Sequence, residues 1–549
     1  MRVALKLLAV VLSGLGLLAG AAVQAQETGG RVVLVLPFEN RSGNPSLNWI
    51  GDSFPDTLDK RLTSVGFLTL SRDDRTFAYV HLGLPEGFKP SRATAIKIAQ
   101  QLDANFVIIG SFNVTQLAGA SAAPDSSTSA DATATESISI QAQVLSVDDL
   151  TLSAPVQDGG NLNHLFDTQN AIAWKLARLM DPQFNIAEQT FLAAPGGVPL
   201  PAFEDYIRGD NAATAEERLQ RLKAAVALAP DYAAALLALG KEQYTQHDYA
   251  AAAATLAKVP PADRVALEAN FYLGLARFNT ANYGGAEQAF GFVASKLPLP
   301  EVVNDQGVAL SRQGKDGVAL FERASQADPS NEDYHYNLAL ALFRRGDTAS
   351  AIQQADAALK LKPEDHEAND LRARLGVVPV GTRLTANADS SFAPVEGIIR
   401  VYSESSYRQA AFQMDQMRAM RMASLPAADR TAQYVQTGRE YLAQGLLPEA
   451  EGQFNLAIAS DPRSSAAHAG LAQVREMSGQ ADAARKEARM SLQLQPNAAA
   501  WVVLGRLDYT ANSLNLSTGD VIQALQLEPT NPGALALRQV LLQHGQSIP

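Results

Sequence analysis

Residues 431–462 read TAQYVQTGREYLAQGLLPEAEGQFNLAIASDP, and small, aromatic and helix-breaking residues recur in them at regular spacing. Two helices joined by a glycine turn explain this spacing, because small residues let helices approach closely and a ring fills the gap between neighbours. The residues that carry the pattern are Gly438, Tyr441, Gly445, Ala450, Phe454, Ala457 and Pro462. The stretch therefore predicts a helical hairpin that packs against similar hairpins.

The same breaker recurs along the chain with a nearly constant period. Pro462, Pro496 and Pro529 are 34 and 33 residues apart, and Pro329 and Pro363 are 34 apart. This period, with a breaker after each helix pair, resembles the tetratricopeptide repeat (TPR) over about 300 residues and implies an all-α TPR solenoid. Equivalent sets of small and aromatic residues are Gly240, Tyr249, Ala252 and Leu256; Gly274, Tyr283, Ala286 and Phe290; and Ala339, Gly346, Ala351 and Ala358.

The period is interrupted once, so we expect two arrays, residues 203–376 and residues 425–549. Residues 377–424 between them predict a linker and a helix from about residue 405 to 422. Half of the chain's eight methionines lie on this helix, namely Met414, Met417, Met420 and Met422. Methionine adapts to irregular surfaces, so these side chains are either an adaptable apolar surface or ordinary packing of the helix onto residues 431–462.

Ahead of the repeats, residues 31–182 predict an α/β domain with a mixed sheet. Apolar runs and alternating patterns predict strands at residues 31–38, 67–70, 106–110, 138–147 and 151–156. Helical spacing predicts helices at residues 52–62, 93–102 and 165–179. The first of these is expected to begin near Asp52, because Pro55 is tolerated only in a first turn. Residues 183–202, rich in proline and glycine toward their end, predict a linker.

Four segments of this domain resemble the TolB-like amino-terminal domain, which is related to the FlgO-type fold. They are LPFENRSGNP at 36–45, LDANFVIIGS at 102–111, the amphipathic stretch 138–150 and FDTQNAIA at 166–173. The resemblance implies a non-catalytic module of the bacterial cell envelope, often followed by helical repeats. Residues 118–136 depart from the family's tight hairpin, because their Ala, Ser, Thr and Asp predict a flexible loop between two strands.

Residues 1–25 have the composition of a secretory signal peptide. Arg2 and Lys6 accompany an apolar run at residues 7–18, and Val23 and Ala25 supply the small residues for cleavage after Ala25. The alternative is an uncleaved anchor, although the run is short for a membrane span. The chain contains no Cys, which excludes disulfides, thiol nucleophiles and thiolate metal sites and suits the bacterial periplasm. We expect a periplasmic protein, free or associated with the outer membrane, and peripheral to the membrane at most.

The sequence contains little that predicts chemistry. A net charge of −12 argues against a nucleic-acid partner, because phosphate needs clustered Lys and Arg. The seven His have no i, i+4 pair, so a zinc-hydrolase site is unsupported. Ser53, in the sequence GDSF, resembles a lipase nucleophile, but it does not follow a strand directly, and helix capping by Asp52 or Ser53 is favoured. Asp73 and Asp74 predict a solvated turn. We therefore expect no catalytic residue, metal or cofactor, and hence no enzyme.

Binding is then expected on the concave side of the arrays, which the first helix of each repeat lines. The repeat register places there the rings and cations of Lys241, Tyr244, Phe271, Phe278, Tyr336, Phe343, Arg344 and Arg439. Rings act as anchors for an extended or helical peptide, and arginine pairs with carboxylates. The alternative for each ring is packing between neighbouring repeats.

Two functions follow from these features. The first is a non-catalytic periplasmic scaffold or adaptor that binds protein or peptide partners of the cell envelope through its TPR grooves, with an α/β domain that docks to the envelope. The second is a sensory or regulatory protein whose α/β domain binds a small molecule or glycan. The sequence leaves the identity of the partner and the oligomeric state open.

Overall fold

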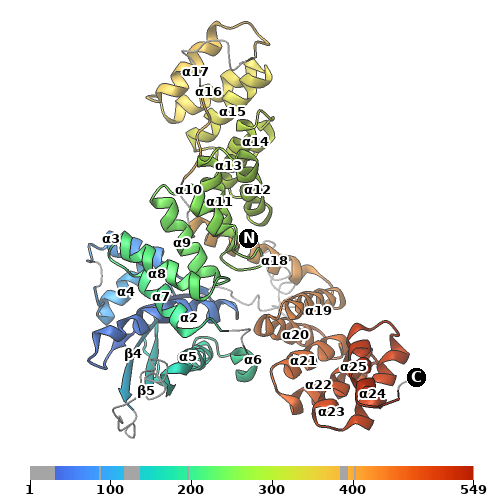
Figure 1. Cartoon of the computed structure of the whole chain (residues 1–549). Coiled ribbons are helices and arrows are strands. Elements are labelled where there is room, and N and C mark those ends of the chain that lie inside the picture. Colours follow the sequence, from blue (N-terminus) through green and yellow to red (C-terminus); the bar gives the residue numbers. More distant parts are fainter. Residues whose placement is uncertain are drawn as a thin grey trace, which may run out of the picture.

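The computed structural model describes residues 31–85, 88–116, 136–193, 197–383, 394–400 and 404–547. The predicted signal peptide and residues 118–135 of the predicted loop lie outside these residues. An α/β domain is followed by an all-helical, TPR-like solenoid, as the sequence predicts (Figure 1). In Figure 1 the blue and cyan α/β domain lies against the first green helices of the solenoid, and the orange and red helices form a second array.

A mixed sheet forms the centre of the α/β domain. Its strands are β1 (Val32–Val35), β2 (Glu39–Asn40), β3 (Leu68–Thr69), β4 (Phe106–Gln116), β5 (Glu136–Ser146) and β6 (Val156–Asn161). The order is β3-β1-β4-β5-β6, and β2 pairs with β4. The strand β1 is parallel to β3 and β4, whereas β4 and β5 are antiparallel with Phe106 opposite Ser146. The predicted pairing of two strands across residues 118–136 is therefore confirmed.

The last strand lies later in the chain than expected. The strand β6 begins at Val156, whereas the strand predicted at residues 151–156 is reduced to a single bridge between Leu152 and Leu145. The strand β6 is at the edge of the sheet and contains Gly159 and Gly160. Such a sequence carries no apolar alternation, because pairing with β5 and not burial holds it in place.

The first helix, α2 (Asn48–Thr63), begins earlier than expected and continues through Pro55. Proline cannot donate to the carbonyl of Gly51, and the backbone N–H of Phe38 donates to that carbonyl instead, at 3.0 Å. Ser53 thus lies inside the helix and caps nothing, so the capping prediction was wrong. Its buried hydroxyl donates to the carbonyl of Ile50 and accepts from the amide of Gln169, which leaves it inaccessible.

The predicted solvated turn at Asp73 and Asp74 is instead the first turn of helix α3 (Arg72–His81). The hydroxyl of Ser71 accepts from the backbone N–H of Asp74, and the carboxylate of Asp74 accepts from the backbone N–H of Ser71. This reciprocal capping box buries Asp74, and its Ser-x-x-Asp signature was present in the sequence. Helix α4 (Arg92–Gln101) packs with α3 on one face of the sheet, and α5 (Leu165–Met180) packs with α2 on the other.

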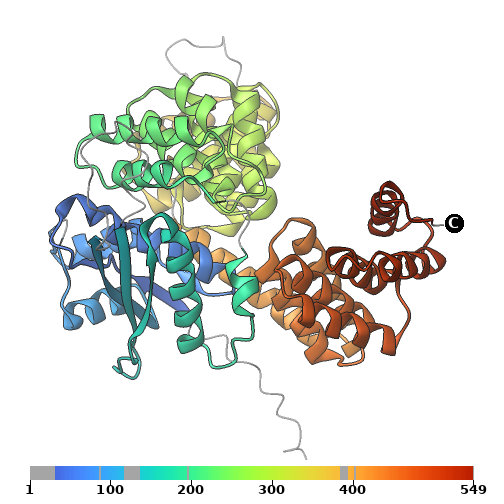
Figure 2. The same ribbon diagram turned by 60° about the horizontal axis from the view of Figure 1, so that its bottom comes forward.

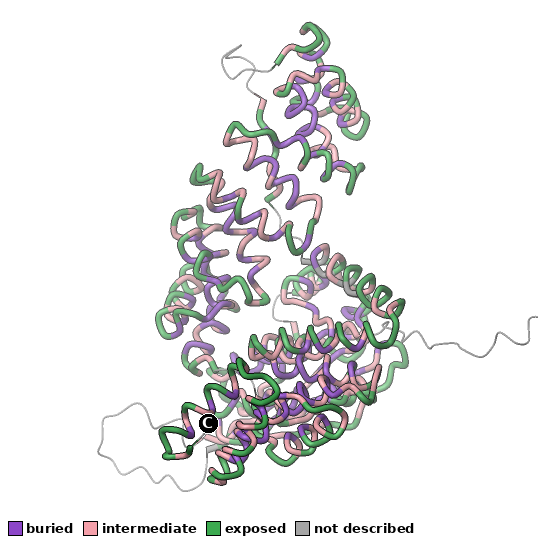
Figure 3. The backbone as a smooth tube through the Cα atoms, turned by 90° about the vertical axis from the view of Figure 1, so that its right-hand side faces the viewer, coloured by how far each residue is buried: buried purple, intermediate pink, exposed green. Residues whose placement is uncertain are grey.

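The solenoid consists of two arrays of helix pairs (Figure 2). The first array comprises α7 (Leu200–Asp210), α8 (Ala215–Leu228), α9 (Ala233–Thr245), α10 (Tyr249–Leu256), α11 (Ala266–Asn279), α12 (Tyr283–Lys296), α13 (Pro300–Arg312), α14 (Val318–Ala327), α15 (Glu332–Arg345), α16 (Thr348–Leu361) and α17 (His366–Val377). The second comprises α19 (Ala427–Ala443), α20 (Leu447–Ser460), α21 (Ser465–Met477), α22 (Ala481–Leu494), α23 (Ala498–Thr510), α24 (Leu514–Leu527) and α25 (Pro532–Gln543). Buried residues recur along both arrays where neighbouring helices meet (Figure 3).

Glycines of the first helix in a pair receive a large side chain from the second helix. A Cβ atom on Gly274 would lie 2.6 Å from the ring of Phe290, and one on Gly240 would lie 2.4 Å from the side chain of Leu256. Phe290 and Leu256 are buried. The prediction that small residues lie where helices touch is confirmed, because a side chain on either glycine would occupy the space of its neighbour.

The helix between the arrays, α18 (Glu404–Ser424), exposes several of its methionines. Met414, Met417 and Met420 are 37%, 62% and 69% exposed. The helix packs through Tyr407, which is buried against residues of α11 and α13. The side chains of Met417 and Met420 are therefore largely exposed and are not buried by packing onto residues 431–462. No helix of the described residues is both long and apolar enough to span a bilayer.

The hydrophobic core continues across the predicted boundary between the α/β domain and the first array. One hydrophobic cluster contains Phe54 of α2, Leu176 of α5, Phe203 of α7 and Leu222 of α8. Polar contacts reinforce this junction: Arg72 pairs with Asp210 at 2.5 Å, and the hydroxyl of Tyr206 donates to Asp56 at 3.1 Å. The first helix pair therefore stabilises the α/β domain and the solenoid together.

Asp56 makes this junction sensitive to pH. Burial, with a smaller contribution from the nearby Asp210, raises the pKa of Asp56 to about 6. Because the folded-state pKa lies above the usual value of 3.8, the contribution of Asp56 to the stability of the junction is fully present below about pH 4 and is lost as the pH rises through about 6. Full ionisation costs about 3 kcal/mol. We expect Asp56→Asn to unfold at higher urea concentration than wild type at pH 7.5, and at a similar concentration at pH 4. The exposed control Asp148→Asn should follow wild type, and an Asp56→Asn chain less stable than wild type at pH 7.5 would contradict the assignment.

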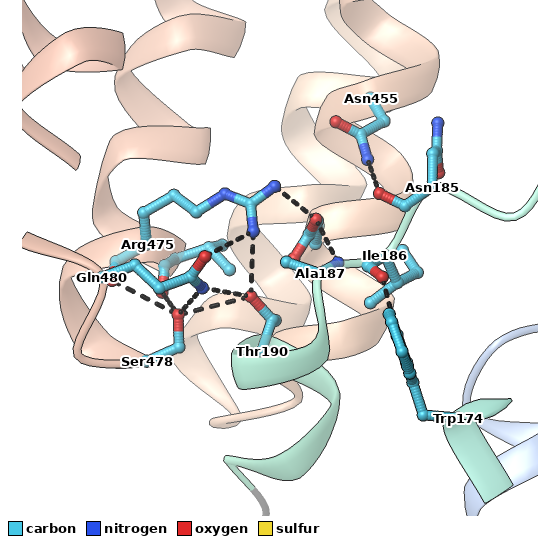
Figure 4. Close-up of polar contacts among 11 residues, drawn as sticks. Trp174, Asn185, Ile186, Ala187, Thr190, Asn455, Arg475, Ser478 and Gln480 are labelled. Carbon is cyan, nitrogen blue, oxygen red and sulfur yellow. Dashed lines mark hydrogen bonds and ion pairs between the residues drawn. The ribbon is translucent and has the colours of Figure 1, made fainter. Parts of the chain in front are cut away.

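The segment predicted as a linker contains a helix that docks on the second array. This helix is α6 (Glu188–Leu192), and Ala187 is the residue just before it. The backbone N–H of Ala187 donates to the carboxylate of Glu451 of α20 at 3.0 Å (Figure 4). Arg475 of α21 donates to the same carboxylate at 2.6 Å and also contacts Thr190 of α6. Glu451 is fully buried, so the pair fixes α6 against the second array.

Aromatic contacts extend the same junction to the α/β domain. The indole N–H of Trp174 donates to the carbonyl of Ile186 at 3.0 Å (Figure 4). The guanidinium of Arg61 lies over the ring of Phe191, 4.5 Å from its centroid. Burial lowers the pKa of Arg61 to about 10, so its charge is held in a partly desolvated site. Residues 183–193 thus connect the α/β domain to the second array through specific hydrogen bonds and a cation–π contact.

Candidate functional site on the inner face of the first array

The first helix of each pair contributes to one face of the first array, which we call the inner face. Residues 394–400, which have no regular secondary structure, lie along this face and contact α13 and α15. Two asparagines, Asn304 of α13 and Asn337 of α15, occupy equivalent positions 33 residues apart. Both are fully buried, although asparagine is mostly exposed in proteins. A buried amide needs hydrogen-bond partners, and residues 394–400 supply them.

The amide of Asn337 pairs with the backbone of Gly397 in two directions. Its nitrogen donates to the carbonyl of Gly397 at 2.8 Å, and its oxygen accepts from the N–H of Gly397 at 2.8 Å. The amide of Asn304 donates to the same carbonyl at 3.3 Å and accepts from Asn337 at 2.8 Å. The two asparagines therefore hold a main-chain unit in one fixed orientation.

A second pair of equivalent positions on α13 and α15 carries a hydroxyl and a guanidinium group, and both bind one carboxylate. Ser311 of α13 and Arg344 of α15, again 33 residues apart, both donate to Glu396. Arg344 also donates to Ser311 at 2.7 Å. The side chain of Glu396 is completely buried, and Arg344 is one-third exposed. A buried carboxylate requires such a partner, since an unpaired one would carry a large desolvation penalty.

A buried acid completes the contacts to the main chain. Asp305 of α13 accepts the N–H of Ile399 at 2.8 Å. Burial raises the pKa of Asp305 well above its ordinary value, and the hydrogen bonds from Ile399 and Asn304 oppose this shift. Its second carboxylate oxygen has no hydrogen-bond partner among the described residues. The buried carboxyl group of Asp305 therefore provides a hydrogen-bond acceptor for the main chain of residues 394–400.

Apolar contacts accompany these polar ones. Ile398 packs against buried residues of two clusters that include Phe343 and Phe271, and Ile399 packs near Tyr334. Both isoleucines remain partly exposed. The inner face thus combines backbone clamps, a carboxylate site and shallow apolar contacts, which together suit an extended peptide.

The residues predicted to bind a partner separate into three groups. Arg344 contacts residues 394–400 directly, and Arg439 is exposed on α19 of the second array, beside a pocket of about 220 Å³ that Ala466 and Ala469 also line. Phe271 and Phe343 are fully or almost fully buried between helices, so the packing alternative describes them. Their rings are core residues that support the inner face from behind.

The remaining predicted residues differ in their contacts and in their burial. Lys241 pairs with Glu268 at 2.6 Å and with Asp73 of the α/β domain at 3.7 Å. The rings of Tyr244 and Phe278 are partly buried, and Tyr336 is buried. For Tyr244, Phe278, Tyr336, Lys241 and Arg439, partner binding stays a prediction.

The sequence analysis missed the residues that hold the main chain. Asn304, Asp305, Ser311 and Asn337 were not selected, because the inner-face residues named from the repeat register were rings and cations. A signal was available: Asn304 and Asn337, and likewise Ser311 and Arg344, share the 33-residue offset of the helices that carry them. Polar residues that recur with the repeat on a buried face indicate a ligand that runs along the array.

The comparisons with known proteins identify the repeats. The sequence profile of the tetratricopeptide repeat family matches residues 305–366 and 435–507, which include α15 and α21. Tetratricopeptide repeat proteins are protein-interaction scaffolds, and the profile matches one stretch in each array of this solenoid. No curated protein matches the chain by sequence.

This chain is similar to several solved structures over part of its length. A tetratricopeptide repeat protein from Parabacteroides merdae is 13% identical, with a TM-score of 0.24, over 56% of this chain and 97% of its own. YrrB, described as a TPR protein with an unusual peptide-binding site, is 17% identical, with a TM-score of 0.28, over 38% of this chain and all of its own. The C-terminal domain of LpoB from Escherichia coli is 21% identical, with a TM-score of 0.18, over 24% of this chain and 82% of its own.

Proposed function

We propose that this protein is a non-catalytic periplasmic scaffold that binds extended segments of partner proteins on the inner faces of its two helical arrays. The observation that carries the proposal is the pair of buried asparagines, Asn304 and Asn337, clamped on the backbone of Gly397. These asparagines recognise main-chain groups, which every extended polypeptide offers. The repeats around them belong to the class of protein-interaction scaffolds.

The location in the envelope rests on the sequence. The signal-like residues 1–25 and the absence of Cys support export to the periplasm. The resemblance of residues 31–182 to the TolB-like domain supports a role of the α/β domain in docking to another envelope component. Its shared core with α7 and α8 would place such a docked domain in a fixed relation to the first array.

Affinity capture with inner-face variants tests this function. The full chain with a C-terminal tag is expressed in its own host and purified from the periplasmic fraction, where we expect a mature N-terminus at Gln26. We expect Asn337→Ala in the first array or Arg439→Glu in the second to lose at least one partner that wild type captures. The control is Gln326→Ala, an exposed residue of α14. Retention of every partner by both variants, or recovery of the chain in the cytosol with residues 1–25 intact, would contradict the proposal.

A further inference from the structure

The inner face of the first array is already occupied by the chain itself. We propose that residues 394–400 are an internal competitor for the partner, and that the partner presents an extended segment with a carboxylate, any residue, and then two branched apolar residues. This inference rests on the proposed function, because it assigns the class of ligand to one of the two inner faces.

The main-chain contacts are open to any extended segment. Asn337 contacts the N–H and carbonyl of Gly397, and Asp305 accepts the N–H of Ile399. None of these three bonds involves a side chain of residues 394–400. A partner in the same conformation would therefore satisfy the same buried groups, and they would not be left unpaired during exchange.

Side-chain selectivity resides at the position of Glu396. Its carboxylate is the buried side chain of residues 394–400 and is contacted by Arg344 and Ser311. The guanidinium of Arg312 also reaches the carbonyl of Glu396, at 3.4 Å. A cationic residue here would face two arginines, so the site selects for Asp or Glu.

The next position tolerates any side chain, whereas the two after it are apolar. A Cβ atom on Gly397 would have no atom within 4 Å, so the glycine is not required by space. Ile398 and Ile399 each pack against buried apolar clusters of the array. The ligand pattern is therefore acidic, any residue, then two branched apolar residues.

A partner could replace most of the contacts that hold residues 394–400. Val395 is 44% exposed, and Gly397 and Arg400 are exposed as well. What favours the internal segment is its tether, which gives an effective concentration of the order of millimolar. A free peptide of the same sequence must therefore bind poorly to wild type and well to a chain whose own segment is dislodged.

A labelled peptide tests this competition. The probe is a fluorescent peptide with the sequence APVEGIIR, residues 393–400, and its binding is followed by fluorescence anisotropy with the full mature chain. We expect Glu396→Lys to bind the peptide at least tenfold more tightly than wild type. The control Val395→Lys, which adds the same charge at an exposed position, should bind as wild type does. Adding Arg344→Glu to Glu396→Lys should abolish binding, and a peptide with Lys in place of Glu should not bind.

A second measurement keeps the Glu396 side chain. Because the chain has no Cys, Ile399→Cys carries a single thiol, whose reaction rate should rise severalfold once the peptide is added above the effective concentration of the tether, about ten millimolar. The exposed control Val395→Cys should not change its rate. If Glu396→Lys binds the peptide no better than wild type, and the thiol of Ile399→Cys stays protected, then residues 394–400 are a fixed part of the fold and the inference fails. Loss of a captured partner with Arg439→Glu would still support the proposed function in that case, so the two failures are distinguishable.

Discussion

Replacing Phe454 by alanine is expected to lower the free energy of unfolding of the second array by about 3–5 kcal/mol. The ring is fully buried, and Cβ atoms on Gly438 and Gly470 would lie 2.8 and 2.2 Å from it. It fills the space between helix α20 and the first helices of two consecutive pairs, α19 and α21. Its removal leaves a cavity that the backbones of two glycines cannot close. Two measurements check this expectation: the urea dependence of unfolding, and the protection of the amides in α19–α22 against hydrogen exchange.

The matched control lies two residues away on the same helix. Leu456 is 43% exposed, and Leu456→Ala should cost much less than Phe454→Ala. The cavity argument also predicts that Gly470→Val destabilises the array, because added methyl groups would overlap the ring. A Phe454→Ala chain with the exchange protection of the Leu456→Ala chain would show that the ring is not the centre of this packing.

Arg475→Ala is expected to release α6 from the second array at a cost of about 3–5 kcal/mol. The substitution removes the charged partner of the fully buried carboxylate of Glu451. Burial already raises the pKa of Glu451, and Thr190 and Arg475 oppose this shift. The other oxygen of Glu451 has no hydrogen-bond partner among the described residues, so without Arg475 only the neutral groups of Thr190 and Ala187 would oppose the effect of burial. Hydrogen exchange measures the effect directly, because the N–H of Ala187 donates to Glu451 and should lose its protection.

Two further variants separate this effect from the loss of any arginine. Arg489, on α22, is exposed, and Arg489→Ala should leave the Ala187 amide protected. The double variant with Arg475→Ala and Glu451→Ala should be less destabilised than Arg475→Ala alone, because it buries no unpaired charge. Equal loss in the double and single variants would mean that the ion pair does not dominate the junction.

The repeat architecture could be predicted because its signals are local. The spacing of Gly274 and Phe290, or of Gly438 and Phe454, is set within one helix pair, and each such pair packs in the structure as expected. The α/β fold class was predictable for the same reason, since strands β1, β4 and β5 carry their own apolar patterns. The errors fall where a distant partner overrides a local rule: Phe38 supplies the donor that lets α2 continue through Pro55.

Of the residues that form the candidate site, the sequence analysis had named Arg344. Arg344 was selected as a groove cation that pairs with carboxylates, and it contacts the carboxylate of Glu396. Rings such as Phe343 were selected with it, yet they are buried between helices. The asparagines were not selected, because an amide on a helix is uninformative until its partner is known.

By itself the sequence determined the period of the helices, the order of the two fold classes and the small-to-large packing within each pair, because these depend on residues close together in the chain. Only the tertiary structure decided that residues 394–400 lie on the inner face of the first array and that α6 lies on the second. Asn337 and Gly397 are 60 residues apart, and Ala187 and Glu451 are 264 apart. Contacts over such separations follow from how the arrays curve and stack, which no local pattern encodes.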